Sequence, residues 1–419
     1  MEKPLHTKDL IARSIGRGRR NLLYRASGAI GRSKYEDERN GSAARFLGRW
    51  VISAPSSLRR AGDWRGRVRD ATLDWVSAQC TFDEGYARVA EGLVDSEIEH
   101  LTTHELLAIR HLVGTVGFFT LTERLLERAL DQAIEDFAKF PNQWSARNAF
   151  TARLLRRELC ELTEPLECWL DSGTSSDPTL VLAFVEMCRT HSSSSSLSQH
   201  VTIVGPGPVG DLGSEFPASA PICRVLMPGV VSWPKDDPFG GRADVGYLNG
   251  DTTRWLSLLS PNERESLVTS FSALRIKRDT SWEEHYPSVS QVRRIKDLFL
   301  TGEPNMVPTA IIDQLIGGVS RVYVTGTSFF VGAEPYRSTD RRHFYTVNSG
   351  SDAFGAVHRN SLERCYSHST HDQIVNRAMV RLLHDAGRVI GDDLFTRALL
   401  MNDSDYLAEL EDVYGRARR

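Results

Sequence analysis

The chain has 419 residues, of which 41% are hydrophobic and 25% are charged, as in globular proteins with room for two or three domains. Its six cysteines form no CxxC pair and no grouping with histidine, so they favour neither a zinc site nor a disulfide scaffold and suit a reducing compartment. No apolar stretch reaches the roughly 20 residues of a membrane-spanning helix, and the amino terminus has no signal-peptide core. We therefore expect a cytoplasmic protein.

The amino-terminal segment, residues 1–65, is rich in Gly, Ser and Arg and shows no sustained periodicity. Residues 1–70 contain 17 Lys and Arg against 7 Asp and Glu, whereas the remainder of the chain is acidic. We interpret residues 1–65 as a partly irregular basic arm, for which two roles stay open: a solvated surface, or peripheral contact with an anionic membrane. Nucleic acid is not expected as a partner, because aromatic residues are sparse there and no nucleic-acid-binding motif accompanies the arginines.

Residues 66–190 are predicted to form a helical domain. Apolar residues recur at helical spacing over 119–137 and again over 144–162. Such stripes usually pack against a core, so we expect no chemistry from this domain. The serine-rich stretch 191–198 that follows is predicted to be a linker.

Residues 199–419 are predicted to form an α/β domain. Short β-branched or apolar runs alternate there with helical segments, and the runs cover residues 201–204, 223–226, 244–248, 321–324 and 388–390. This alternation predicts a mainly parallel, Rossmann-like sheet flanked by helices, preceded by the α-helical amino-terminal region.

The first of these runs leads directly into the glycine-rich turn Gly205-Pro-Gly-Pro208, which with Gly210 fits the spacing G-x-G-x-x-G. Because an open α/β sheet binds ligands outside the carboxyl ends of its strands, the turn indicates a nucleotide phosphate site. Proline removes backbone donors from the turn, and no Asp or Glu lies between Phe216 and Pro234 to hold a ribose, so a dinucleotide is less favoured. An ordinary strand-to-loop turn remains the alternative.

Taken in order, segments within residues 200–395 resemble the sialyltransferases, which transfer a sugar from a cytidine monophosphate (CMP) donor. The resemblance starts with the glycine turn and Arg224, continues through Gly240-Gly-Arg-Ala-Asp-Val245 and Asn249, and includes the segment from Pro308 to Gly326. It implies a donor that carries sialic acid or a related keto-deoxy sugar, a glycan acceptor as in polysaccharide biosynthesis, and a reaction that needs no metal or other cofactor.

The last block of the family carries its catalytic histidine, and His371-Asp372 takes that place here. A histidine suits a general base for the acceptor hydroxyl because its ordinary pKa, about 6.5, lies near working pH. His368, three residues earlier, competes for the role, and packing or helix capping is the alternative for either. The chain departs from the family pattern at Ala310, Leu226 and Asn376.

The predicted nucleotide-binding residues come from the turn, the strands and a helix start: Gly205, Gly207, Pro208, Arg224, Asn249, Pro308, Thr309 and Gly326. Backbone donors and a helix-start hydroxyl suit a leaving phosphate, and an arginine adds a fixed positive charge. Structural roles stay open for Arg224, which could pair with an acid, and for Asn249, which could simply form a turn. The acids Asp403 and Asp405 precede a helical segment, so we expect them to cap a helix rather than hold a metal. Two other functions remain: a catalytically inactive nucleotide- or sugar-binding module, and a Rossmann-type enzyme that uses another nucleotide.

Overall fold

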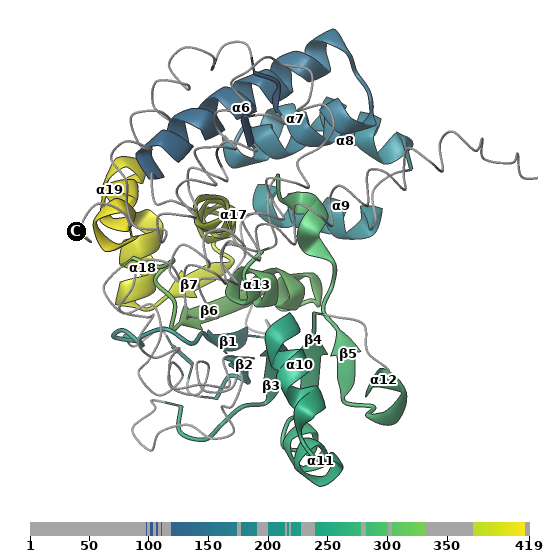
Figure 1. Cartoon of the computed structure of the whole chain (residues 1–419), viewed down its shortest axis with the longest axis vertical. Helices are drawn as coiled ribbons and strands as arrows, with labels where there is room; N and C mark the ends of the chain where they lie inside the picture. Colours follow the sequence, from purple (N-terminus) through teal and green to yellow (C-terminus); the bar gives the residue numbers. More distant parts are fainter. Residues whose placement is uncertain are drawn as a thin grey trace, which may run out of the picture. The chain divides into compact units, whose positions relative to one another are not determined.

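The computed structural model describes residues 98, 101–103, 106–107, 110, 119–173, 177–190, 200–213, 216–217, 219–227, 239–277, 282–300, 304–331 and 372–414. The chain divides into two compact units: one comprises residues 1–129, 357–369 and 414–419, and the other comprises residues 130–356 and 370–413. The predicted arm, residues 1–65, and the predicted linker, residues 191–198, lie outside the described residues. The second unit contains the whole sheet (Figure 1).

The described part of residues 119–190 forms four α-helices, and the apolar periodicity over 119–137 and 144–162 predicts the first two of them. They are α6 (Phe119–Lys139), α7 (Gln143–Leu155), α8 (Thr163–Asp171) and α9 (Pro178–Arg189), with a short 3-10 helix η3 (Leu159–Glu161) after α7. In the first unit, the Thr122 hydroxyl donates to the Phe119 carbonyl in the first turn of α6, and Arg110 Nε donates to the Thr122 carbonyl.

The helix predicted over residues 144–162 ends earlier, at Leu155. Arg157 has a φ of 61°, in the left-handed region, and its N–H donates to the Leu154 carbonyl. The next N–H, of Glu158, donates to the Arg153 carbonyl. These two bonds form a Schellman motif, which stops a helix even where apolar residues continue.

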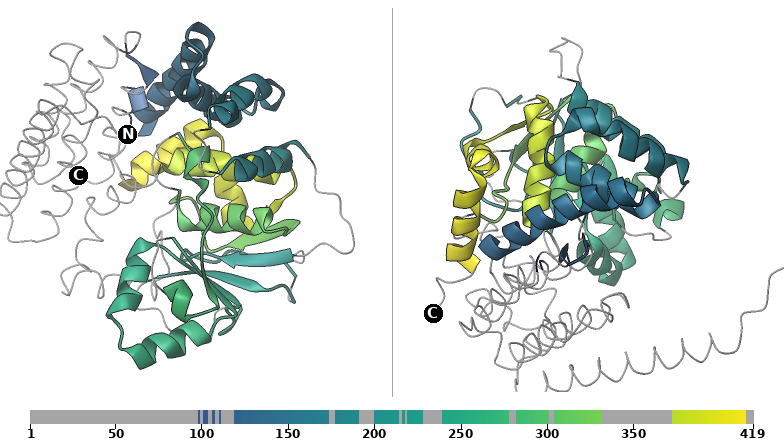
Figure 2. Two further views of the ribbon diagram at one scale, coloured as in Figure 1. Left: turned by 90° about the vertical axis from the view of Figure 1, so that its right-hand side faces the viewer. Right: turned by 90° about the horizontal axis from the view of Figure 1, so that it is seen from above.

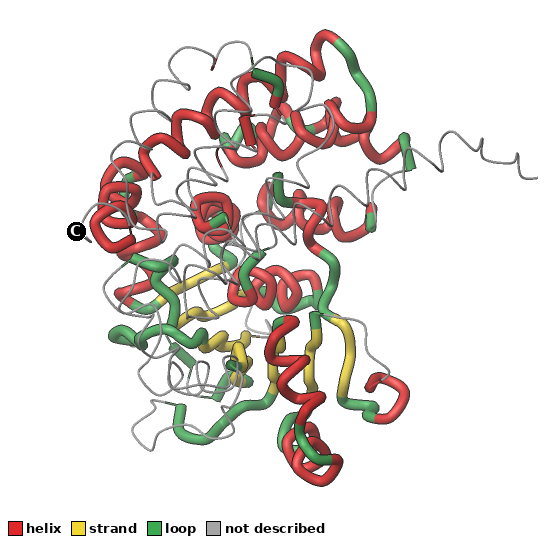
Figure 3. Tube along the Cα trace, in the orientation of Figure 1, coloured by secondary structure: helices red, strands yellow, loops and turns green. Residues whose placement is uncertain are grey.

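Among the described residues, seven strands form one parallel sheet, and they are the yellow segments of Figure 3. They are β1 (His200–Val204), β2 (Ile222–Leu226), β3 (Val245–Leu248), β4 (Ala273–Ile276), β5 (Val289–Gln291), β6 (Arg321–Thr325) and β7 (Val389–Gly391). Their order is β5-β4-β3-β2-β1-β6-β7, and every neighbouring pair is parallel. The predicted parallel α/β fold is therefore confirmed, and β4 and β5 are strands that the sequence pattern did not indicate.

Helices cover both faces of this sheet (Figure 2). The described helices that follow β3 are α10 (Gly250–Leu258), α11 (Pro261–Thr269), α12 (Trp282–His285), the 3-10 helix η4 (Ile295–Leu298), α13 (Met306–Ile316), α17 (Gln373–Asp385), α18 (Asp393–Leu400) and α19 (Asp403–Tyr414). Adjacent residues of β3 show the two faces, because side chains alternate along a strand. Leu248 packs in a core with Trp255 of α10 and Val268 of α11, whereas Tyr247 contacts Asp313 of α13.

The strand order places a topological switch point between β1 and β6. From β1 the chain adds β2, β3, β4 and β5 on one side, and then returns to add β6 and β7 on the other side. β1 and β6 end level with each other, because Val204 pairs with Thr325. Open α/β sheets bind ligands in the crevice outside the carboxyl ends of the strands at such a point.

Candidate functional site

Glycines meet at the carboxyl ends of β1 and β6. A Cβ added to Gly205 would lie 2.3 Å from the Gly326 carbonyl oxygen, and one added to Gly326 would lie 2.5 Å from the Gly205 carbonyl oxygen. Gly326 also has a φ of 70°, which glycine adopts without cost. The approach of the two backbones therefore requires glycine at both positions, so the structure brings two of the predicted site residues together at the switch point.

Backbone donors of the glycine turn are bound to the protein itself. The Gly205 N–H donates to the Thr325 carbonyl at 2.8 Å, and the Gly207 N–H donates to the Gly326 carbonyl at 2.6 Å. The Gly210 N–H donates to a carboxylate oxygen of Asp392 at 2.8 Å. Pro208 has no N–H and is half-buried. These bonds fix the turn to β6 and to the end of β7, so a phosphate at this point has to be bound by other groups.

Asp392, directly after β7, links three elements at this edge. Its side chain caps α18 by accepting from the Phe395 N–H at 2.7 Å, and it also accepts from the Thr325 hydroxyl and the Gly210 N–H. The carboxylate is buried, and buried charges need such donors. Asp392 thus joins the glycine turn, β6 and α18.

The first turns of α13 and α17 meet next to the glycine pair. Asn305, just before α13, donates its Nδ2 to Gln373 Oε1 at 2.8 Å, and its backbone N–H donates to Asn376 Oδ1 at 2.9 Å. Gln373 is only 2% exposed, yet its Nε2 has no hydrogen-bond partner among the described residues. A buried amide donor without an acceptor is costly unless a ligand or water completes it.

The amino-terminal end of α13 has further donors that the N-cap residue does not bind. The Asn305 side chain does not cap the helix, so the first N–H groups, of Met306 and Val307, receive no side-chain acceptor from it. α17 starts at the same edge but is capped by Asp372, which accepts from the Val375 N–H at 3.1 Å. The end of α13 therefore suits an anion, both through its uncapped N–H groups and through the helix dipole.

The predicted residues Pro308 and Thr309 lie in this first turn of α13. Pro308 costs no hydrogen bond there, because the first N–H groups of a helix have no intrahelical acceptor. The Thr309 hydroxyl donates to the Asn305 carbonyl at 2.7 Å and is buried. Val307 lies beside the glycine turn, since its Cγ2 is 3.1 Å from the Cβ position of Gly205. The structure thus gathers Gly205, Gly207, Gly326, Pro308 and Thr309 in one place.

Two predicted residues have structural partners instead. Arg224 of β2 is 1% exposed, and its guanidinium donates to the carbonyls of Arg242 at 2.8 Å and Gly240 at 3.0 Å. Asn249 begins α10 at the carboxyl end of β3, where its Oδ1 accepts from the Thr252 N–H at 2.8 Å. Its Nδ2 has no recorded partner among the described residues and stays a candidate ligand contact.

Both candidate catalytic histidines, His368 and His371, lie outside the described residues. The residue after His371 is Asp372, the N-cap of α17 at the switch point. Asp403 and Asp405 lie within the first turn of α19, so they do not cap it as expected; Asn402 does, because its Oδ1 accepts from the Asp405 N–H at 2.8 Å. Among the described residues no cluster of His, Cys, Asp and Glu has the composition of a metal site, and no described helix is long and apolar enough to cross a membrane.

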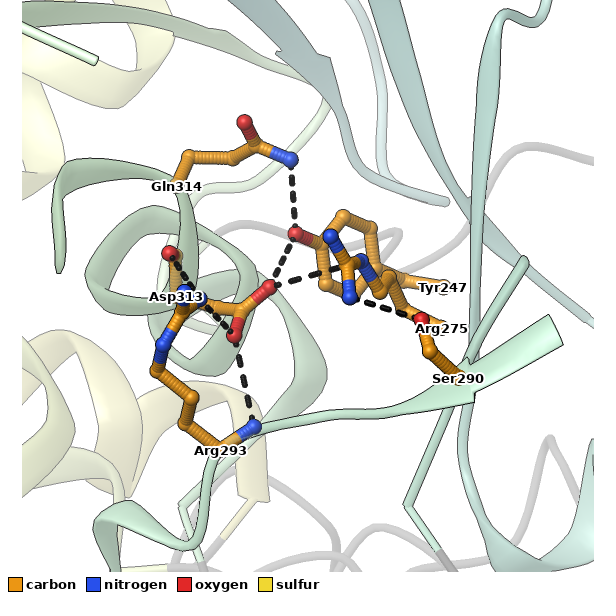
Figure 4. Close-up of polar contacts among 6 residues, drawn as sticks. All are labelled: Tyr247, Arg275, Ser290, Arg293, Asp313 and Gln314. Atoms are coloured by element: carbon orange, nitrogen blue, oxygen red, sulfur yellow. Dashed lines mark hydrogen bonds and ion pairs between the residues drawn. The ribbon is translucent and has the colours of Figure 1, made fainter. Parts of the chain in front are cut away.

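A second polar centre lies under the other half of α13 (Figure 4). Asp313 is buried and accepts from the Tyr247 hydroxyl at 2.7 Å and from Arg293 Nη1 at 2.8 Å. Arg275 Nε lies 4.0 Å from the same carboxylate, and Gln314 Nε2 donates to the Tyr247 hydroxyl at 2.8 Å. Burial and the neighbouring Asp313 raise the pKa of Tyr247 far above its ordinary value, so its hydroxyl stays a donor.

This Asp313 centre joins α13 to three strands of the sheet. Tyr247, Arg275 and Ser290 stand side by side on β3, β4 and β5, and Arg275 Nη1 donates to Ser290 Oγ at 2.6 Å. The sequence analysis missed the centre. Its one local signal is an aspartate that is the single charged residue of the mostly apolar helix segment Met306–Ile316, because a buried carboxylate needs buried partners.

Comparisons with protein-family models, with curated proteins and with solved structures find no match for this chain.

Proposed function

We propose that this protein is a glycosyltransferase that moves sialic acid or a related keto-deoxy sugar from a CMP-activated donor to a hydroxyl of a glycan acceptor. The observation that supports it best is the junction of α13 and α17 at the switch point. There the uncapped first turn of α13 lies beside the Gly205–Gly326 contact, together with the buried Gln373 Nε2, which has no partner in the part of the chain that the structure describes. The order of the sequence blocks that resemble sialyltransferases runs through the same elements.

In this proposal the phosphate of the donor binds the N–H groups of Met306 and Val307 and the amide of Gln373, rather than the glycine turn. The general base, His371 or His368, removes the proton of the acceptor hydroxyl as its oxygen attacks the anomeric carbon. The bond from that carbon to the phosphate oxygen breaks, and CMP leaves with the bonding electrons. The dipole of α13 and the N–H donors stabilise the charge that develops on the phosphate. The reaction uses no metal.

An inactive nucleotide-binding module is the second candidate. Asn376 stands where the family usually has a glutamate, and both ends of its amide are bound: Oδ1 accepts from the Asn305 N–H, and Nδ2 donates to the Asp372 carbonyl. In a module, the site would bind CMP without cleaving the donor.

Calorimetric titration with CMP, a nicotinamide dinucleotide and adenosine triphosphate tests the binding step. We expect CMP to bind most tightly, and preference for a dinucleotide would refute the proposal. Hydrolysis or transfer of a CMP-activated keto-deoxy sugar then separates the enzyme from the module.

Gln373→Glu tests the site itself. The variant keeps an oxygen to accept from Asn305 Nδ2 but replaces the unpaired donor by a negative charge. We expect CMP affinity to fall by about tenfold or more, because like charge is disfavoured near a phosphate. Gln314→Glu is the matched control, since its amide lies in the Asp313 centre. Equal losses in both variants would contradict a phosphate at Gln373.

Substitution of the two histidines assigns the base. We expect His371→Ala to lose most of the transfer activity, by about a hundredfold or more, while CMP binding is retained. If turnover falls only in His368→Ala, the assignment moves to that residue, and if neither variant loses activity, the general-base step is refuted.

The basic arm is proposed to hold the protein at an anionic membrane that carries the glycan acceptor. Co-sedimentation with vesicles that contain phosphatidylserine checks this, in the full chain and in a variant that lacks residues 1–65. Binding that persists without the arm would refute the attachment.

A further inference from the structure

The loop that leaves β6 at the switch point has an unusual backbone. Gly326 has a φ of 70°, and Phe329 and Phe330 follow with φ values of 49° and 68°. Left-handed backbone is unfavourable for bulky residues other than glycine, and two in succession persist only where the surroundings enforce them. Some contact must therefore hold the loop Gly326–Val331 in this conformation.

Contacts to Phe329 supply that restraint. Its ring is buried and lies 5.5 Å from the ring of Phe395, between centroids. Its carbonyl accepts a hydrogen bond of 2.9 Å from the hydroxyl of Tyr406, in α19. Within the loop, the Ser328 hydroxyl donates to the Val331 carbonyl, and the Val331 N–H donates back to the Ser328 carbonyl.

Tyr406 is itself held firmly. Its side chain is fully buried, and the Arg377 guanidinium lies over its ring at 4.4 Å from the centroid. Arg377 also donates to the carbonyls of Ala398 and Met401 and pairs with Asp403, so it joins α17, α18 and α19. Burial raises the pKa of Tyr406 well above its ordinary value, with Arg377 opposing and Asp372 and Asp403 adding to the rise. The hydroxyl thus remains protonated at working pH and can always donate.

The loop that Tyr406 contacts is joined to the switch point. It begins at Gly326, whose carbonyl accepts from the Gly207 N–H. The Tyr406 hydroxyl donates to the Phe329 carbonyl in the same loop. A hydrogen bond from α19 therefore acts on the loop that carries Gly326.

We propose that Tyr406 is a positioning residue of the switch-point site: its hydroxyl holds the loop Gly326–Val331 in the left-handed conformation that keeps Gly326 against the glycine turn. That the loop shapes a CMP site rests on the proposed function, whereas the restraint on the loop does not. Tyr406 touches no reacting atom and acts through the loop alone.

Hydrogen exchange of the full chain tests the restraint directly. In Tyr406→Phe, which keeps the ring and its contact with Arg377, we expect amides of the peptide over residues 326–331 to exchange about fivefold faster. The peptide over β2 should be unaffected. Tyr247→Phe is the matched control, because it also removes a buried hydroxyl, one that bonds Asp313. Unchanged exchange of 326–331 in Tyr406→Phe would overturn the proposal.

A second variant tests whether the left-handed backbone of the loop explains the effect of Tyr406→Phe, as opposed to a general loss of folded structure. Asparagine adopts left-handed backbone more readily than phenylalanine, so Phe330→Asn should lower the strain that the hydroxyl opposes. Tyr406→Phe is therefore made in two backgrounds, the natural chain and Phe330→Asn. We expect it to raise the exchange rate of residues 326–331 less in the Phe330→Asn background than in the natural chain. Equal increases would mean that the hydroxyl does not act on the backbone conformation.

Titration with CMP tests the consequence for the site. We expect Tyr406→Phe to weaken CMP binding about fivefold and Tyr247→Phe to leave it unchanged. Faster exchange with unchanged CMP affinity would overturn the positioning role. If the natural chain does not bind CMP, the proposed donor fails, while the exchange experiment still decides whether Tyr406 holds the loop.

Discussion

The two ends of α13 make opposite use of polar groups. Around its carboxyl-terminal half, Asp313 and Tyr247 are bound by donors and acceptors of the protein, and the arginines beside them face the same carboxylate. At its amino-terminal end, the helix has no side-chain cap, and the neighbouring Gln373 Nε2 is buried without a partner among the described residues. In the proposed function, the first of these ends stabilises the fold and the second binds the ligand.

The two ends of α13 also show that a buried polar cluster can be structural or can be a candidate binding site. Perturbed ionisable groups are often used as a sign of a functional site. In this chain the raised pKa of Tyr247 lies at the end of α13 where the buried carboxylate of Asp313 has donors, whereas the proposed site contains an amide that does not titrate. Both ends include a buried nitrogen without a hydrogen-bond partner among the described residues, Arg275 Nε and Gln373 Nε2, but Arg275 Nε lies 4.0 Å from the Asp313 carboxylate.

The largest effect is expected at the end of α13 that contains Asp313. Asp313→Ala leaves the Tyr247 hydroxyl and two arginines without their carboxylate, so we expect the free energy of unfolding in urea to fall by about 3 kcal/mol or more. Asp131→Ala, which removes a half-exposed carboxylate paired with Arg156, should cost less than about 1 kcal/mol. A large loss of CMP affinity in folded Asp313→Ala would contradict the claim that this end of α13 contributes to stability but not to CMP binding.

Next in size is the glycine contact at the ligand end. Gly205→Ala puts a methyl group 2.3 Å from the Gly326 carbonyl oxygen, so we expect a loss of about 2–3 kcal/mol in unfolding free energy. Gly241→Ala is the control, because no atom lies within 4 Å of its added Cβ, and its effect should stay within about 0.5 kcal/mol. Equal stability of the two variants would show that β1 and β6 are not held in contact by these glycines.

Alkaline pH should destabilise the core around α13. Burial raises the pKa of Cys223 to about 12 and that of Cys188, in α9, to about 12, from an unfolded value of 9.0. The folded state then binds more protons than the unfolded state between pH 9 and 12, so stability is complete below pH 9 and falls as pH rises through that window.

The expected slope is about 1 kcal/mol per pH unit for each thiol, measured by urea unfolding at several pH values from 8 to 11. Cys223→Ala should reduce the slope without removing it, because Cys188 remains. An unchanged slope in Cys223→Ala would mean that this thiol does not titrate on unfolding.

The smallest effect sharpens the role of Asn249. Asn249→Ala removes the cap of α10 and should cost about 1 kcal/mol, whereas Asn249→Asp keeps an oxygen for the Thr252 N–H and should be nearly neutral in stability. Asn249→Asp also removes the Nδ2 donor. Calorimetry then measures the CMP affinity of Asn249→Asp. Reduced affinity would show that Asn249, at the carboxyl end of β3, contributes to the binding site, whereas unchanged affinity would show that it only caps α10.

Local sequence patterns predict most of the fold and only part of the candidate site. The runs that became β1, β2, β3, β6 and β7 are rich in β-branched residues, which fit a buried parallel strand. β4 and β5 escaped notice because Arg275 and Ser290 interrupt their apolar pattern, and both contribute to the Asp313 centre. The polar residues that break the apolar pattern of these strands are thus the ones that take part in the polar contacts around Asp313.

For the site, the glycine turn and the helix start at Pro308 are visible in the sequence because turn and cap chemistry is local. The pairing of Asn305 with Gln373 is not visible, since the two residues are 68 positions apart. Arg224 shows the reverse case: its residue type suggests a phosphate ligand, but its position in the strand directs it to the carbonyls of Gly240 and Arg242.

The sequence alone determined the alternation of strands and helices and the glycines at which β1 ends, because periodicity and backbone freedom act over a few residues. Only the tertiary structure decided which polar groups have partners. Within the described residues, hydrogen bonds between distant segments bind Arg224 and Asp313, whereas the first turn of α13 has no side-chain cap and Gln373 Nε2 has no partner. Because the partner of a buried polar group can come from any part of the chain, its hydrogen bonding cannot be known before the chain is folded.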